Sequence, residues 1–96
     1  MKLIQSAQVG TFESSDIMIL IDPADMGTGR DIELDSNVIL QYGDDILQSI
    51  HKILDKYEIA DVKMVATDKG ALNHTIEARV EAALLRAMNI QKGTLL

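Results

Sequence analysis

The sequence predicts a small two-layer α+β domain, with about four mostly antiparallel strands and two helices packed on one face. Three observations predict it. Short apolar runs fill the first 35 residues, and longer runs with apolar residues three and four apart follow. The segment DPADMGTGRD (22–31), which contains the single proline, carries the strongest turn signal. The 96 residues suffice for one domain, which we expect at 1–90, with a flexible tail at 91–96.

Four segments have the pattern of strands. They are residues 2–9, 16–21, 31–35 and 61–67. The second, DIMILI, places isoleucines on one face and Met18 and Leu20 on the other, which indicates a central strand covered on both sides, or an interface. The third, DIELD, alternates apolar and acidic residues, as a half-buried strand does. The loop at 22–30 is expected to join the second and third strands as an antiparallel hairpin.

A first helix is predicted over residues 37–57, where apolar residues recur at helical spacing. Asp35 or Ser36 is expected to cap it. Gly43 interrupts the pattern at a cost of about 1 kcal/mol, so residues 38–42 are alternatively a strand. We favour one continuous helix.

A second helix is predicted to open at Thr67 or Asp68. Its apolar stripe comprises Leu72, Ile76, Val80, Ala83, Leu84 and Ala87. The expected order of elements is therefore β-β-β-α-β-α, the pattern of an α+β fold.

Composition excludes several classes of function. The net charge is −6 and the nine basic residues are scattered, which argues against nucleic acid and against an anionic membrane surface as partners. The chain has no cysteine, and no apolar run is long enough to span a membrane. The N-terminus lacks the apolar run of a signal peptide, so we expect a cytoplasmic protein.

The sequence offers no complete catalytic or metal site. His51 and His74 lie on different predicted helices, and neither has a second ligand at metal-binding spacing. Gly27 and Gly29 form a lone G-x-G, which turn geometry explains better than phosphate binding. No triad can be assembled around a serine. We expect no metal site and no independent hydrolase.

The segment GTFESSD (10–16) remains. Ser14 and Ser15 lie between Glu13 and Asp16, directly after a glycine that ends the first apolar run. Serine and aspartate are common in turns, and by composition alone a turn is the favoured interpretation. The alternative is that one exposed hydroxyl is an attachment point, because modified serines lie on protruding segments.

Several separated motifs give the chain a resemblance to a known family. They are GT-x-ESSD at 10–16, YGD at 42–44, DKGAL at 68–72 and I-x-ARVE-x-AL-x-RA at 76–87. In this order they resemble the acyl carrier protein of citrate lyase, its gamma subunit, over about residues 1–88. Phe12 replaces an expected leucine and Tyr42 an expected phenylalanine. The loop at 22–31 and the last eight residues match least.

The resemblance implies a non-catalytic carrier subunit. Ser14 would carry 2′-(5″-phosphoribosyl)-3′-dephospho-coenzyme A through a phosphodiester, and Ser15 is the less favoured anchor. The thiol of this group would hold acetyl and then citryl while citrate is cleaved to acetate and oxaloacetate. The implied partners are the citrate lyase alpha (acyl transferase) and beta (citryl lyase) subunits and a prosthetic-group transferase. We expect Glu13 and Asp16 to contribute to recognition by basic partner surfaces.

A second hypothesis needs no cofactor. The chain would be a small α+β protein-interaction module that binds a partner through the two-sided DIMILI strand, and the serines would only form a turn. Intact mass after exposure to the modifying enzymes separates the two hypotheses.

Overall fold

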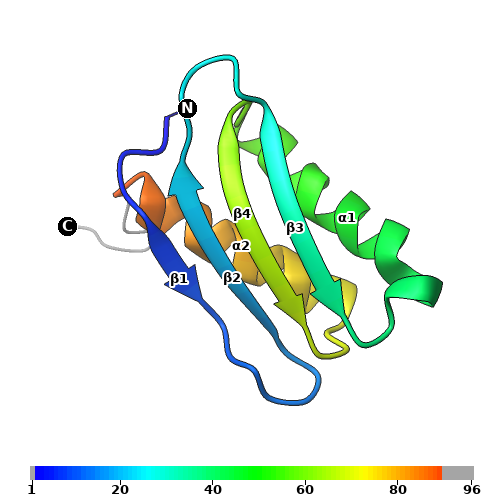
Figure 1. Ribbon diagram of the computed structural model, residues 1–96. Helices are drawn as coiled ribbons and strands as arrows, with labels where there is room; N and C mark the ends of the chain where they lie inside the picture. Colours follow the sequence, from blue (N-terminus) through cyan, green and yellow to red (C-terminus); the bar gives the residue numbers. More distant parts are fainter. Residues whose placement is uncertain (1, 90–96) are drawn as a thin grey trace.

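The computed structural model describes residues 2–89 and confirms the predicted α+β fold and element order (Figure 1). The strands are β1 (Ala7–Val9), β2 (Ile17–Pro23), β3 (Arg30–Ser36) and β4 (Val62–Asp68), and the helices are α1 (Ile39–Lys56) and α2 (Asn73–Ala87). The predicted tail at 91–96 lies outside the described residues.

The strands form one mixed sheet in the order β1-β2-β4-β3. β2 pairs antiparallel with β1 and β4, whereas β3 pairs parallel with β4. The predicted hairpin between β2 and β3 is therefore wrong, because β4 lies between them. The reason is burial: the inward residues Val62, Met64 and Ala66 of β4 are at most 2% exposed, which suits an inner strand. β3 presents outward acids, which suit an edge.

Both helices cover the same face of the sheet, as predicted (Figure 1). α2 packs on β1 and β2, and α1 packs on β3 and on α2. The isoleucines of β2 at 17, 19 and 21 are at most 1% exposed and form the centre of the core. The prediction that DIMILI is a central strand is confirmed, because β2 is an inner strand. Coverage on both sides is not found: among residues 2–89 both helices lie on one face, and Leu20 on the other is 38% exposed.

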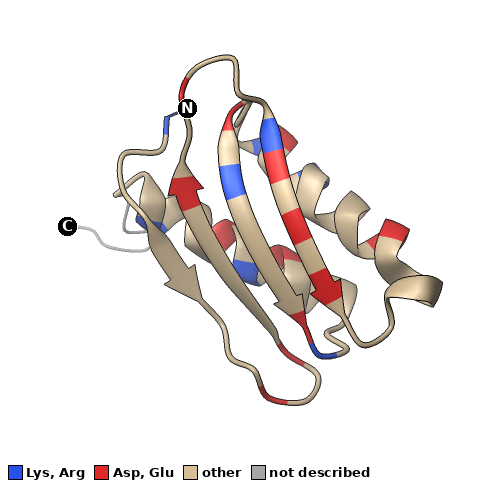
Figure 2. Cartoon of the chain, in the orientation of Figure 1, with Lys and Arg blue, Asp and Glu red and all other residues tan. Residues whose placement is uncertain are grey.

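Within residues 2–89, no helix lies on the other face of the sheet. Leu20 on β2 and Val65 on β4 are paired neighbours there, exposed by 38% and 39%. Acidic residues recur along the adjacent β3 (Figure 2), at Asp31, Glu33 and Asp35. This face is thus partly apolar along its middle and acidic along one edge.

α1 runs without a break through Gly43, which confirms the long helix and excludes the strand at 38–42. Gly43 is buried, and an added Cβ would lie 3.1 Å from Ile39 Cγ1. The predicted cap is wrong, since Val38 occupies the N-cap position without a side-chain cap. Ser36 is the last residue of β3, and its Oγ accepts a hydrogen bond from the Val38 N–H at 3.2 Å.

α2 begins at Asn73, six residues after Thr67 and five after Asp68, the two positions at which the helix was predicted to open. Asp68 is still in β4 and is only 1% exposed. Its carboxylate accepts hydrogen bonds from the backbone N–H groups of Gly70 and Ala71, which form a loop before the helix. Leu72, predicted on the apolar stripe, occupies the N-cap position and is 63% exposed.

Candidate functional site

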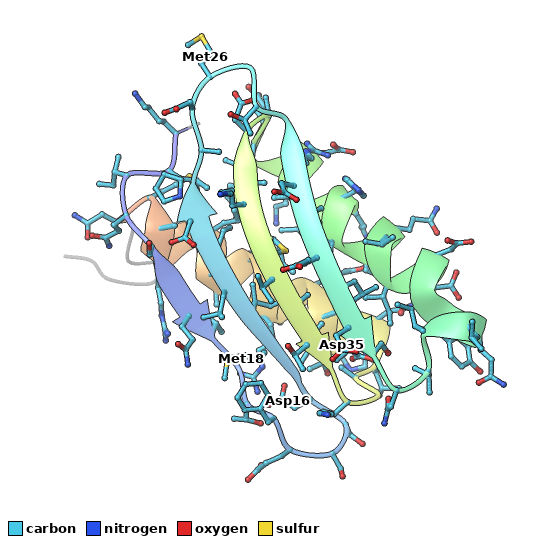
Figure 3. All side chains as sticks on the ribbon, in the orientation of Figure 1. Asp16, Met18, Met26 and Asp35 are labelled. Atoms are coloured by element: carbon cyan, nitrogen blue, oxygen red, sulfur yellow. The ribbon has the colours of Figure 1, made fainter. Side chains whose placement is uncertain are left out.

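The loop at 10–16 connects β1 to β2 at one end of the sheet (Figure 3). The Asp16 N–H donates to the Glu13 carbonyl at 3.2 Å and closes a turn with Ser14 and Ser15 at its centre. Ser15 has a φ of +65°, the sign required at the second central position of a type II turn. Both serines are exposed, and within residues 2–89 no hydrogen bond involves either hydroxyl. The turn therefore presents two free hydroxyls to solvent.

Gly10 permits the two stems of this loop to approach each other. Its φ is +100°, and an added Cβ would lie 1.9 Å from the carbonyl oxygen of Ile17. No side chain fits at that distance from the backbone of a buried strand. The glycine that ends the first apolar run is therefore required by close backbone packing.

Asp16 fixes the loop to α2. Its carboxylate accepts two hydrogen bonds from Arg79, Nε to Oδ1 and Nη2 to Oδ2, both at 3.0 Å. It also accepts the Thr11 hydroxyl at 2.6 Å and the Ile17 N–H at 2.7 Å. The Thr11 hydrogen bond, assisted by Arg79 and Ile17, lowers the pKa of Asp16 from 3.8 to about 2, although burial opposes the shift. Asp16 is thus a charged anchor inside the fold.

The loop between β4 and α2 supports the serine turn from the other side. The Ser15 N–H donates to the Lys69 carbonyl at 2.8 Å, and the Lys69 N–H donates to the Asp16 carbonyl at 2.9 Å. Asp68 accepts the Ser36 hydroxyl at 2.8 Å, which links this loop to the end of β3. The Lys69 side chain is exposed and makes no ion pair within the described chain. An exposed lysine is therefore on the segment whose backbone is hydrogen-bonded to the serine turn.

A pocket of about 500 Å³ lies next to this loop, between the start of α1 and the start of α2. Its lining combines apolar and polar side chains: Val38, Tyr42, Asp45, Ile46, Asp68, Gly70, Ala71, Leu72, Asn73 and His74. Residues of the YGD and DKGAL motifs are among them. Motifs that are distant in the sequence therefore meet at the same end of the molecule as GTFESSD.

The predicted site residues differ in their exposure to solvent. Ser14, Ser15 and Glu13 are all exposed, whereas Asp16 is 9% exposed and bound to Arg79. A role of Glu13 and Asp16 in recognition stays a prediction, and Asp16 has a structural task in addition.

The two histidines lie apart, on different helices. His51 Nδ1 is 3.0 Å from Arg30 Nη1, and His74 lines the pocket. Among residues 2–89, no cluster of three or more His, Cys, Asp or Glu side chains could hold a metal ion. Gly27 and Gly29 have φ of +90° and +82°, which confirms turn geometry for the lone G-x-G.

Sequence reasoning missed Arg79 and Lys69 as parts of the site. Arg79 lies 63 positions after the aspartate it binds, and no periodicity links the two. The only signal was that both cations belong to motifs of the resemblance, ARVE and DKGAL. Only the tertiary structure identifies the pairing of Arg79 with Asp16.

Known proteins share this sequence and this fold. A family model described as "Malonate decarboxylase delta subunit (MdcD)" matches residues 4–87. The citrate lyase acyl carrier protein of Haemophilus ducreyi is 44% identical over 87 residues, covering 91% of this chain and 88% of that protein. The one from Latilactobacillus sakei is 47% identical over 88 residues, covering 92% and 85%.

A solved structure has the same fold at low sequence identity. It is a chain of a Pseudomonas malonate decarboxylase hetero-tetramer in complex with malonate. Its TM-score is 0.72 at 18% identity, and the match covers 91% of this chain and 92% of that one.

These matches define the class as that of acyl carrier subunits. Within that class, the chain belongs to the family of citrate lyase acyl carrier proteins. The family model that matches the chain bears the description of the malonate decarboxylase delta subunit. In the part of the chain that the structure describes, neither helix is long and apolar enough to cross a membrane.

Proposed function

We propose that the chain is the carrier subunit of citrate lyase, with 2′-(5″-phosphoribosyl)-3′-dephospho-coenzyme A bound through a phosphodiester to Ser14. The observation that carries this proposal is the free, exposed Ser14 hydroxyl on a turn whose stems are fixed by Gly10, Asp16 and Lys69. When bound, the group supplies a thiol that holds acetyl and citryl as thioesters during cleavage of citrate to acetate and oxaloacetate.

The residues around Ser14 fit a phosphodiester. The exposed Lys69 lies on the segment hydrogen-bonded to Ser15 and offers a positive charge near the new negative one. Glu13 is an opposing negative charge, but it is exposed, and water screens its repulsion. Both hydroxyls are exposed. The preference for Ser14 over Ser15 as the anchor comes from the family motif, in which the first serine of ESSD is the attachment position.

The chain itself would do no bond chemistry. Its task is to hold the arm on a rigid base, so that a tethered thioester stays at high local concentration near each partner site. The partners we propose are the alpha and beta subunits of citrate lyase, which catalyse acyl exchange and citryl cleavage, and the transferase that attaches the arm. We place this assembly in the cytoplasm.

Recognition by these partners would involve Glu13 directly, since its carboxylate is exposed beside the anchor serine. Asp16 would contribute indirectly, because it holds the turn through Arg79 and has little exposed surface. The charge of −6 favours a partner with a basic docking surface.

Intact-mass measurement tests the proposal. The chain is produced with the enzymes that build and attach the arm, alongside Ser14→Ala and Ser15→Ala. We expect a mass gain equal to the nucleotide arm in the wild-type chain and in Ser15→Ala, and none in Ser14→Ala. Failure of the wild-type chain to gain mass, with a known carrier modified in the same preparation, would reject the proposal.

One observation favours the alternative of an interaction module without a cofactor. Leu20 and Val65 form an exposed apolar pair on the helix-free face of the sheet. The same mass measurement decides, because an interaction module would gain no mass. A carrier also needs docking surfaces, so this apolar pair is compatible with both functions.

A further inference from the structure

The pocket of about 500 Å³ between the two helix starts lies beside the serine turn, and a role in anchoring alone gives it no function. We propose that this pocket holds the uncharged, thiol-bearing end of the arm between transfers, in contact with Tyr42 and Leu72. This inference rests on the proposed function, since it requires an arm on Ser14.

The pocket is within easy reach of the anchor. Ser15 is hydrogen-bonded to Lys69, and the residues on both sides of Lys69, Asp68 and Gly70, line the pocket. With about 3.8 Å between successive Cα atoms, Ser14 is on the order of 10–15 Å from the lining. An arm made of a nucleotide and a pantetheine unit is longer than this and can fold back.

The chemistry of the lining suits the free end of the arm and not its phosphates. Val38, Ile46 and Leu72 offer aliphatic surface, and Tyr42 adds a ring. Leu72 and Tyr42 are 63% and 53% exposed, so a ligand would remove apolar surface from water at both residues. The side chains of Asn73 and His74 can hydrogen-bond the two amides of pantetheine. Asp45 disfavours an anion in the same place.

Attachment near the pocket favours the arm, rather than a free small molecule, as the occupant of the pocket. A volume of about 500 Å³ is in the range of small-molecule sites, but the pocket is open and would bind a free ligand weakly. A group attached nearby has an effective concentration of about 1 mM or more. Even an intrinsic dissociation constant of about 1 mM would then keep the pocket occupied for about half the time. Such occupancy would shield the thiol or its acetyl thioester from water and from stray reactants.

The test uses the loaded carrier without partner subunits, after mass spectrometry has confirmed the arm. The variant Leu72→Asn removes apolar surface from the lining. It is expected to fold, because Leu72 is the N-cap of α2 and asparagine is a preferred N-cap residue. Leu40→Asn is the matched control, since Leu40 is on α1, fully exposed and not part of the lining.

The first readout is the rate at which the free thiol reacts with the disulfide reagent dithiobis(nitrobenzoate). We expect the wild-type carrier and Leu40→Asn to react about twofold more slowly than Leu72→Asn. Loss of the leucine contact should weaken the intrinsic affinity of the pocket for the arm about tenfold, so occupancy falls from about one half to about one tenth. The second readout is amide NMR, with shifts at Val38, Gly70 and Ala71 between unloaded and loaded carrier that Leu72→Asn abolishes.

Equal thiol rates in all three loaded proteins, with shifts confined to residues 13–16, would overturn the pocket proposal while leaving the carrier function intact. Absence of the arm in the mass spectrum would instead reject the proposed function. The two failures are therefore distinguishable.

Discussion

Two acidic loops lie at opposite ends of the sheet, and each is held by one aspartate. The loop at 10–16 is held by Asp16 (labelled in Figure 3). The carboxylate of Asp16 accepts hydrogen bonds from Arg79 and Thr11. The loop at 24–29 is held by Asp61, whose Oδ1 accepts the N–H groups of Gly27 and Gly29 at 3.0 and 2.8 Å. One anchor is a charged side-chain network that ties the loop to a helix, and the other binds only backbone.

The two loops differ in the groups that their aspartates hold in place. Asp16 holds the base of a turn with free serine hydroxyls at its tip. The tip of the other loop, Met26, is 95% exposed and carries no group that supports attachment (Figure 3). A loop that must be read by a modifying enzyme benefits from a fixed base, whereas a plain connection needs only satisfied backbone groups. The following predictions test this contrast, from the largest expected effect to the smallest.

Gly10→Ala should lower the free energy of unfolding by about 3 kcal/mol, because a Cβ would clash with the Ile17 carbonyl. The matched control is Gly27→Ala in the other loop. It also has positive φ but no atom within 4 Å of the added Cβ, so we expect a loss of about 1 kcal/mol. Urea unfolding measures both, and equal losses would show that the stems of the first loop separate readily.

Asp16→Asn should lower stability by about 2 kcal/mol at pH 7, in line with a pKa reduced from 3.8 to about 2. Because the unfolded chain binds this proton more tightly, the contribution is complete above about pH 5 and is lost as the pH falls toward 2. Urea midpoints of the wild-type chain and the variant should therefore converge on acidification. A constant difference down to pH 2.5 would contradict the role of the charge.

Asp61→Asn should cost about 1 kcal/mol, because a neutral amide oxygen still accepts both backbone N–H groups, though less strongly. We expect no change in the rate of arm attachment, since the loop at 24–29 is at the far end of the sheet from Ser14 (Figure 1). Thermal unfolding and the attachment assay provide the two measurements. Slower attachment would mean that the two ends of the sheet are coupled.

Glu13→Lys should leave stability unchanged within about 0.5 kcal/mol, because the side chain is exposed and its hydrogen bond to Asp16 uses the backbone carbonyl. We expect kcat/KM for arm attachment to fall about three- to tenfold, as reversal of a docking charge reduces association. Asp25→Lys in the opposite loop makes the same charge change as a control. If both variants are modified at the wild-type rate, Glu13 has no part in recognition.

Local patterns in the sequence were sufficient for the elements and for the exposed turn. Alternation at 16–21 and 61–67 and helical spacing after residue 37 depend only on neighbours along the chain, and the structure confirms these strands and helices. The predicted opening of α2, at Thr67 or Asp68, lies five or six residues before its first residue, Asn73. Asp68 has the composition of a cap, but its carboxylate is taken by Ser36 on another strand.

The sequence by itself determined the α+β class, most of the core face of the helices and the exposed position of Ser14, because these follow from short-range polarity and turn chemistry. Only the tertiary structure decided that β4 separates β2 from β3, that Asp16 binds Arg79, and that a pocket lies beside the serine turn. Those features depend on contacts between residues up to 63 positions apart, which packing of the whole chain selects and no local pattern encodes.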